Sequence, residues 1–148
     1  MTDTVLFEST KSKQLRIKEI FSHCTSSQMK YEKIIELGRT LPEYPKEWMA
    51  DEYLVSGCQS SMYLHSFLLD GKVQFQAHSD ALISAGLVAL LLAAYHNEPP
   101  EAILRCPPTF LEELGISEAL SPSRSNGLSS LFLKMKQDAL QLLLKPHK

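Results

Sequence analysis

The stretch SMYLHSFLLDGKVQFQAH, residues 61–78, predicts a β-hairpin and thereby the class of the fold. Asp70-Gly71 at its centre is a dipeptide favoured in two-residue hairpin turns, because both turn positions need a positive φ. After the turn, Val73, Phe75 and Ala77 alternate with polar residues, as they do in a strand with one buried face. We therefore expect two antiparallel strands, over residues 61–69 and 72–78.

Two helices are expected before the hairpin. The first is indicated by apolar residues at positions i, i+3, i+4 and i+7, which share one helix face: Ile17, Ile20, Phe21 and Cys24. For the second helix, Ser26 or Ser27 can act as the N-cap, and Gly38 stands where a helix usually ends. The segment between this helix and the hairpin contains two prolines and is expected to be a loop.

Helical patterns also follow the hairpin. The segment from Ala81 to Tyr95 has no polar face, which predicts a helix buried nearly all round, and Asp80 is placed to cap it. Ser125 or Asn126 can cap the last helix, whose apolar residues follow the 3.6-residue period: Leu128, Leu131, Phe132, Met135, Ala139, Leu142 and Leu143. The sequence therefore predicts an α+β domain, a small antiparallel sheet of about three strands with helices packed against it.

Length and composition limit the function classes. The 148 residues fit one domain, 1–148, in which we expect residues 1–12 to be loose, and the net charge of -2 gives no electrostatic case for binding nucleic acid. The longest apolar run, Ala85 to Tyr95, is shorter than the roughly 20 residues of a membrane helix, so no membrane span is expected. Three cysteines without an apolar leader favour reduced thiols in a cytoplasmic protein.

Cys58 stands at the corner where a polar loop becomes the first strand. Its neighbours Gly57, Gln59 and Ser60 are glycine and polar residues, which are uncommon around a core residue, so this thiol is a candidate nucleophile. Only about 3% of an unperturbed thiol is ionised at pH 7, so a reactive cysteine needs a nearby cation or helix N-terminus. Arg124, in the segment LSPSRSNGL before the last helix, can supply that cation. The alternative is a buried structural cysteine, the commoner role of this residue type.

The remaining cysteines and histidines are interpreted as structural. Cys24 and Cys106 are expected to pack in the core, and the pair His23-Cys24 lacks a second pair at zinc-like spacing, so no metal site is expected. His65 and His78 could each serve as the base of a cysteine hydrolase. Both lie on the hairpin, however, where a surface or packing role is the commoner one.

Four segments resemble the SufE family of sulfur acceptors: GCQS at 57–60, SDA at 79–81, GLVALLLAAY at 86–95 and LSPSRSNGL at 120–128. The resemblance implies a SufE/NifU-like fold and a partnership with a SufS-type cysteine desulfurase, the pyridoxal-phosphate enzyme that removes sulfur from cysteine. It implies no resident cofactor. It also implies that the sulfur passes on to a downstream scaffold for iron-sulfur cluster assembly.

The same resemblance implies roles for individual residues. Cys58 matches the acceptor thiol that becomes a persulfide, and Arg124 and Asp80 match the arginine and the acidic residue of the family's segments. Gly57, Gln59 and Ser60 complete the signature of the loop that meets the partner. Two other functions remain open, an iron-sulfur cluster scaffold and a module that activates the desulfurase without accepting sulfur. Arg124 in turn could act on the thiolate, on the partner or on the fold.

Overall fold

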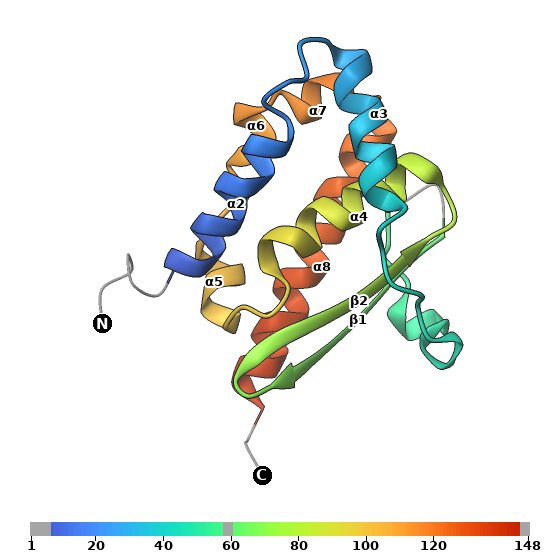
Figure 1. Ribbon diagram of the computed structural model, residues 1–148. Coiled ribbons are helices and arrows are strands. Elements are labelled where there is room, and N and C mark those ends of the chain that lie inside the picture. The colour runs from blue at the N-terminus through green and yellow to red at the C-terminus, as the bar shows by residue number, and fades with distance from the viewer. Residues whose placement is uncertain (1–6, 58–60, 146–148) are drawn as a thin grey trace.

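The computed structural model describes residues 7–57 and 61–145, which form one β-hairpin with helices packed on one of its faces (Figure 1). The elements in chain order are α2 (Glu8–Ile20), α3 (Ser27–Gly38), the 3-10 turns η1 (Lys46–Trp48) and η2 (Asp51–Tyr53), β1 (Met62–Leu69), β2 (Lys72–Ser79), α4 (Leu82–Tyr95), α5 (Pro100–Arg105), α6 (Phe110–Glu113), α7 (Ile116–Ala119) and α8 (Pro122–Leu144). The α+β class is confirmed.

The hairpin has the expected turn and register. Asp70 and Gly71 have φ values of 53° and 76°, and β1 pairs with β2 from Leu69 opposite Lys72 to the far end of both strands. Between the described residues the sheet has two strands rather than the predicted three or so. Its two outer edges are extended only by single bridges, one on each side: Leu54 with Tyr63, and Val73 with Glu98. Neither neighbouring segment stays extended long enough to form a third strand.

The core lies between the hairpin and the helices. In Figure 1, α4 and α8 are on the same side of the hairpin, where α4 packs against β2 and α8 against β1. The α4 helix is mostly buried, as predicted, although Leu82 and Ala93 are exposed. It also packs tightly against α3, because a Cβ atom on Gly86 would lie 2.0 Å from the carbonyl oxygen of Ile34. None of the helices in the described ranges is both long and apolar enough to cross a membrane.

The N-terminal segment differs from its prediction. Residues 8–12 were expected to be loose, but they form the first turns of α2. Thr10 is fully buried, and its hydroxyl donates a hydrogen bond to the carbonyl of Ala94 at 2.7 Å. This contact with α4 fixes the helix start, and the polar residue types around it gave no sign of it. At its other end α2 stops at Ile20, so Cys24 lies beyond the helix in a partly buried turn.

Candidate functional site

A loop closed at its base carries the candidate thiol. The backbone N–H of Val55 donates to the carbonyl of Met62 at 2.9 Å, and this bond joins the two stems of the loop formed by residues 56–61. A second bond holds the end of the loop, because the carbonyl of Ser61 accepts the N–H of Asp80. Cys58, Gln59 and Ser60 lie outside the described residues. Two described residues that flank this stretch, Val55 and Ser61, are bonded to the start of β1 and to the residue after β2.

Gly57 presses this loop against α8. Its φ of +87° lies in the left-handed region that favours glycine, and a Cβ atom built on it would lie 2.6 Å from the Oγ atom of Ser130. The residue before Cys58 therefore needs to be glycine for two reasons, its backbone conformation and its close approach to the helix. Ser130 was not predicted as part of the site, since nothing in its local sequence relates it to a loop so far away in the chain.

Arg124 lies in the first turn of α8, not in a loop before the helix as predicted. Pro122 fixes a helical φ at the first position and Ser121 is the N-cap, so the helix begins earlier than Ser125 or Asn126. The Arg124 side chain is exposed, and its guanidinium carbon lies 5.9 Å from the centre of the Tyr31 ring on α3.

Arg124 and the residue that contacts Gly57 belong to the same helix. Arg124 precedes Ser130 by six positions, which is a rise of about 9 Å along a helix axis. The structure thus brings the loop at Gly57 and the arginine to the N-terminal half of α8. The aromatic partner Tyr31 was not predicted as part of the site, since no local signal relates it to Arg124.

Asp80 contributes to the site through its backbone. The prediction that its side chain caps α4 is wrong, because the N-cap position is Ala81 and no side chain bonds to that helix end as a cap. The N–H of Ala81 instead donates to the Oγ atom of Ser79 at 3.3 Å. This leaves the Asp80 carboxylate exposed beside Ser61, at the described end of the loop.

The two hairpin histidines lie in an aromatic layer on the face of the sheet opposite the helices. His65 stacks on Trp48 with ring centres 3.9 Å apart, and its Nδ1 atom lies 2.8 Å from the Oε1 atom of Gln76. The ring centre of His78 lies 6.2 Å from that of Tyr44. Both histidines therefore pack against aromatic rings, which agrees with the packing role preferred above.

The two described cysteines differ in burial. Cys106 is 6% exposed, and burial raises the pKa of its thiol. Cys24 is partly buried, and its Sγ atom lies 3.8 Å from the carbonyl oxygen of Met29. Within residues 7–57 and 61–145, no three His, Cys, Asp or Glu side chains are grouped so that they could hold a metal ion.

Comparisons with known proteins agree with the resemblance of the motifs. The family model named SufE, the Fe-S metabolism associated domain, matches residues 15–139. The chain is 35% identical over 129 residues to an uncharacterized SufE-like protein of Synechocystis, a match that covers 87% of this chain and 81% of that protein. It is also 32% identical over 139 residues to SufE-like protein 1, chloroplastic/mitochondrial, of Arabidopsis thaliana. That match covers 93% of this chain but only 38% of the longer plant protein.

A solved structure shows the same fold. The solution structure of a hypothetical protein from Thermus thermophilus superposes with a TM-score of 0.74 at 24% sequence identity. The superposition covers 90% of this chain and 97% of the other. The arrangement of hairpin and helices described above is thus one that an independent chain also adopts.

Proposed function

The chain belongs to the SufE family, whose domain is associated with iron-sulfur metabolism, and we propose that it accepts sulfur from a cysteine desulfurase through Cys58. One observation supports this most directly. The short loop that contains Cys58 is held at both ends, by the bond from Val55 to Met62 and by the bond from Asp80 to Ser61. Such a loop can present a thiol to another protein while its base stays fixed to the sheet.

The transfer is a thiol exchange. The Cys58 thiolate attacks the terminal sulfur of a persulfide on the desulfurase's cysteine, and a new S–S bond forms on Cys58. The partner's S–S bond breaks, and its electron pair leaves with the partner's thiolate, which then takes up a proton. No oxidant or reductant is consumed. Because the exchange returns the desulfurase's cysteine to its free form, the acceptor also stimulates the desulfurase.

The sulfur then leaves by the same chemistry. A thiolate of a downstream iron-sulfur scaffold attacks the terminal sulfur on Cys58, and the Cys58 thiolate departs. This cycle needs reduced thiols, so we place the protein in a reducing compartment such as the cytoplasm.

In this proposal, two charged residues assist the exchange, Arg124 and Asp80. The Arg124 guanidinium and the first turn of α8 both favour an anion, so either can stabilise a thiolate or a persulfide anion held near them. Asp80 bonds to Ser61 through its N–H, and its exposed carboxylate is available to the partner. We expect the desulfurase to contact Gly57, Gln59 and Ser60, the neighbours of Cys58 in the sequence.

The test is the mass of the intact protein after incubation with a pyridoxal-phosphate cysteine desulfurase and cysteine. We expect one added sulfur on the peptide that carries Cys58, removed by a thiol reductant, and none on Cys58→Ser. The matched controls are Cys24→Ala and Cys106→Ala, which should still gain the sulfur. If Cys58→Ser stimulates the desulfurase fully, the chain is an activator without transfer; if iron and sulfide give a stable chromophoric cluster on it, it is a scaffold. Either result would overturn the proposal.

A further inference from the structure

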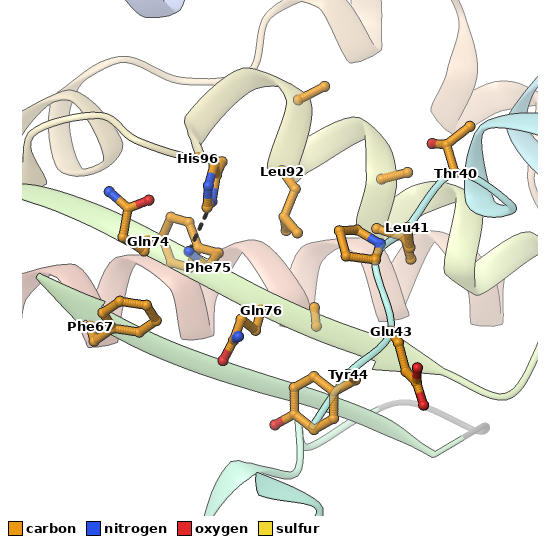
Figure 2. Close-up of a pocket in the computed structure, with 14 residues that line it drawn as sticks. Thr40, Leu41, Glu43, Tyr44, Phe67, Gln74, Phe75, Gln76, Leu92 and His96 are labelled. Carbon is orange, nitrogen blue, oxygen red and sulfur yellow. Dashed lines mark hydrogen bonds between the residues drawn. The ribbon is translucent and has the colours of Figure 1, made fainter. Parts of the chain in front are cut away.

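A groove runs along the outer edge of β2, away from the loop that carries Cys58. It has a volume of about 460 Å³ and lies between β2, one side of α4 and residues 40–44 (Figure 2). Leu41 lies at one end and His96 at the other, with Leu92 between them. Two of its lining residues, Tyr44 and Gln76, also contact the hairpin histidines, but the groove contains neither Arg124 nor Asp80.

The outer edge of β2 directs backbone groups away from β1, toward this groove. Both backbone groups of Val73 point away from β1. Its N–H donates to the carbonyl of Glu98 and its carbonyl accepts the N–H of Asn97, each at 2.8 Å. Alternate residues of an antiparallel strand point their backbone groups the same way, so Phe75 and Ala77 also point theirs outward. The N–H of Phe75 donates to the Nδ1 atom of His96 at 3.0 Å.

The next backbone groups have no such partner. Neither the carbonyl of Phe75 nor the N–H and carbonyl of Ala77 hydrogen-bonds to any of the residues that the structure describes. Both residues are at least 95% buried, and both line the groove. Buried backbone groups are nearly always hydrogen-bonded in native proteins. Unpaired groups along a strand edge are a template for another strand.

The walls of the groove define which strand fits. Its floor on α4 is apolar, formed by Ala89, Leu92 and Ala93, whereas Glu43 places a carboxylate at its rim. No lysine or arginine among the described residues lines the groove. Burial lowers the pKa of His96, so this side chain is neutral at pH 7 and does not balance Glu43. The groove therefore suits a segment with apolar side chains toward α4 and a cation toward the rim.

We propose that an extended segment of a partner protein pairs with β2 at Phe75 and Ala77, as an added strand. Two apolar side chains at alternate positions pack on the α4 floor, and a lysine or arginine between them faces the outer side of the sheet and Glu43. This interaction does not depend on sulfur transfer. It would let the protein bind a second partner while the Cys58 loop is free.

The probe is the capped peptide acetyl-Thr-Val-Lys-Val-Thr-amide, titrated into the isotope-labelled protein and followed by NMR. We expect the amide signal of Ala77 to shift and its hydrogen exchange to slow as the peptide saturates. A peptide N-methylated on its central residues cannot donate to the strand edge and should bind about tenfold more weakly, the effect of roughly one lost main-chain bond. A peptide with glutamate in place of lysine should also bind more weakly.

Variants of the protein locate the site. Ala93→Trp adds a ring at an exposed position in the groove and should abolish the peptide-induced shift of Ala77. Gln137→Trp, at an exposed position of α8 outside the groove, should leave that shift unchanged. Glu43→Gln should remove the preference for lysine over glutamate in the peptide, and Glu47→Gln, outside the groove, should retain it. These two glutamates are surface residues, so the comparison stands even if Ala93→Trp folds poorly.

Three results would overturn the proposal. The first is no shift at Ala77 with millimolar peptide, and the second is equal binding of the N-methylated peptide. The third is a concentration-dependent shift at Ala77 without peptide, which would make the groove a contact between two copies of this chain.

Discussion

The backbone N–H of Asp80 donates to the carbonyl of Ser61 across 3.4 Å, so the first residue after β2 holds the last residue of the Cys58 loop. The bond joins two segments that are separated along the chain, at Ser61 and at Asp80. The hairpin brings them together, because Met62 pairs with Ser79.

Gly57→Ala should strain this loop. Its φ of +87° costs a non-glycine residue about 1–2 kcal/mol, and the new methyl group would collide with Ser130. We expect a lower free energy of unfolding in urea and slower sulfur acceptance from a desulfurase. Adding Ser130→Ala removes the hydroxyl from the collision and should recover part of the loss. Wild-type stability and transfer in Gly57→Ala would show that the loop adapts freely to a side chain here.

Gly86→Ala should destabilise the fold more strongly, without a direct effect on the thiol. Its Cβ atom would lie 2.0 Å from the carbonyl oxygen of Ile34, which is backbone and cannot rotate away. Forcing α3 and α4 apart is an overpacking change, and we expect a loss of about 3 kcal/mol in urea denaturation. Gly71→Ala is the control, since its Cβ atom would meet nothing within 4 Å and adds only the turn strain. Equal losses in the two variants would contradict the close contact of the helices.

Stability should fall below neutral pH through His96. Burial, followed by the nearby Lys13, lowers its pKa in the folded protein, whereas in the unfolded chain it titrates near 6.5. The unfolded state therefore binds more protons as the pH drops below about 6.5, and the free energy of unfolding decreases. His96→Gln should flatten this decrease in urea titrations between pH 7.5 and 5.5. His23→Gln, at an exposed turn, should leave the slope as it is, and a similar flattening there would refute the assignment.

Cys106 should be the slower of the two described cysteines to react. Its thiol is buried and its pKa is raised, so little reactive thiolate reaches an alkylating agent. Peptide mapping after brief iodoacetamide treatment at pH 8 should show more label on Cys24 than on Cys106, and equal label in urea. Cys106→Ala should cost about 1 kcal/mol of stability and leave sulfur acceptance unchanged. Loss of transfer in this folded variant would show that a second thiol takes part.

The hairpin and the long helices were predictable because their signals are local. Asp70-Gly71 fixes the turn, and the spacing of apolar residues marks each helix face. The start of α8 was misplaced by four or five residues, because both serine and asparagine can cap a helix and the proline at its first turn was read as part of a loop. Local sequence offers several possible caps, and tertiary packing chooses among them.

The site was predictable only in part. The motif resemblance proposed Cys58, Arg124 and Asp80 as site residues, but it did not predict the contacts that the structure shows around Gly57 and Arg124. Ser130 touches the loop at Gly57 and Tyr31 underlies Arg124, and both contacts join segments far apart in the chain. Such pairs depend on how the helices pack, which no short stretch of sequence encodes. The helix cap expected of the Asp80 side chain was wrong for the same reason, since α4 has no side-chain cap and Asp80 bonds to Ser61 through its backbone.

The last prediction separates three roles of Arg124. The side chain is exposed and lies over Tyr31, so its contribution to the fold is a surface cation–π contact of about 0.5–1 kcal/mol. Arg124→Ala and Tyr31→Leu should therefore lower stability by similar small amounts. If the guanidinium stabilises the Cys58 thiolate, Arg124→Ala should shift alkylation of Cys58 to higher pH in the free protein, whereas Tyr31→Leu should not. Arg124→Lys should restore part of that shift, since it keeps the charge but not the planar fork.

If Arg124 instead docks the desulfurase, the alkylation profile of Arg124→Ala should match the wild type while binding to the desulfurase weakens. Arg39→Ala is the control for a general loss of positive charge, because Arg39 is an exposed arginine at the end of α3. We expect the first outcome, because Arg124 lies in the first turn of α8, where the helix dipole adds to its own charge in favouring a thiolate. An unchanged alkylation profile together with unchanged desulfurase binding in Arg124→Ala would remove this residue from the site.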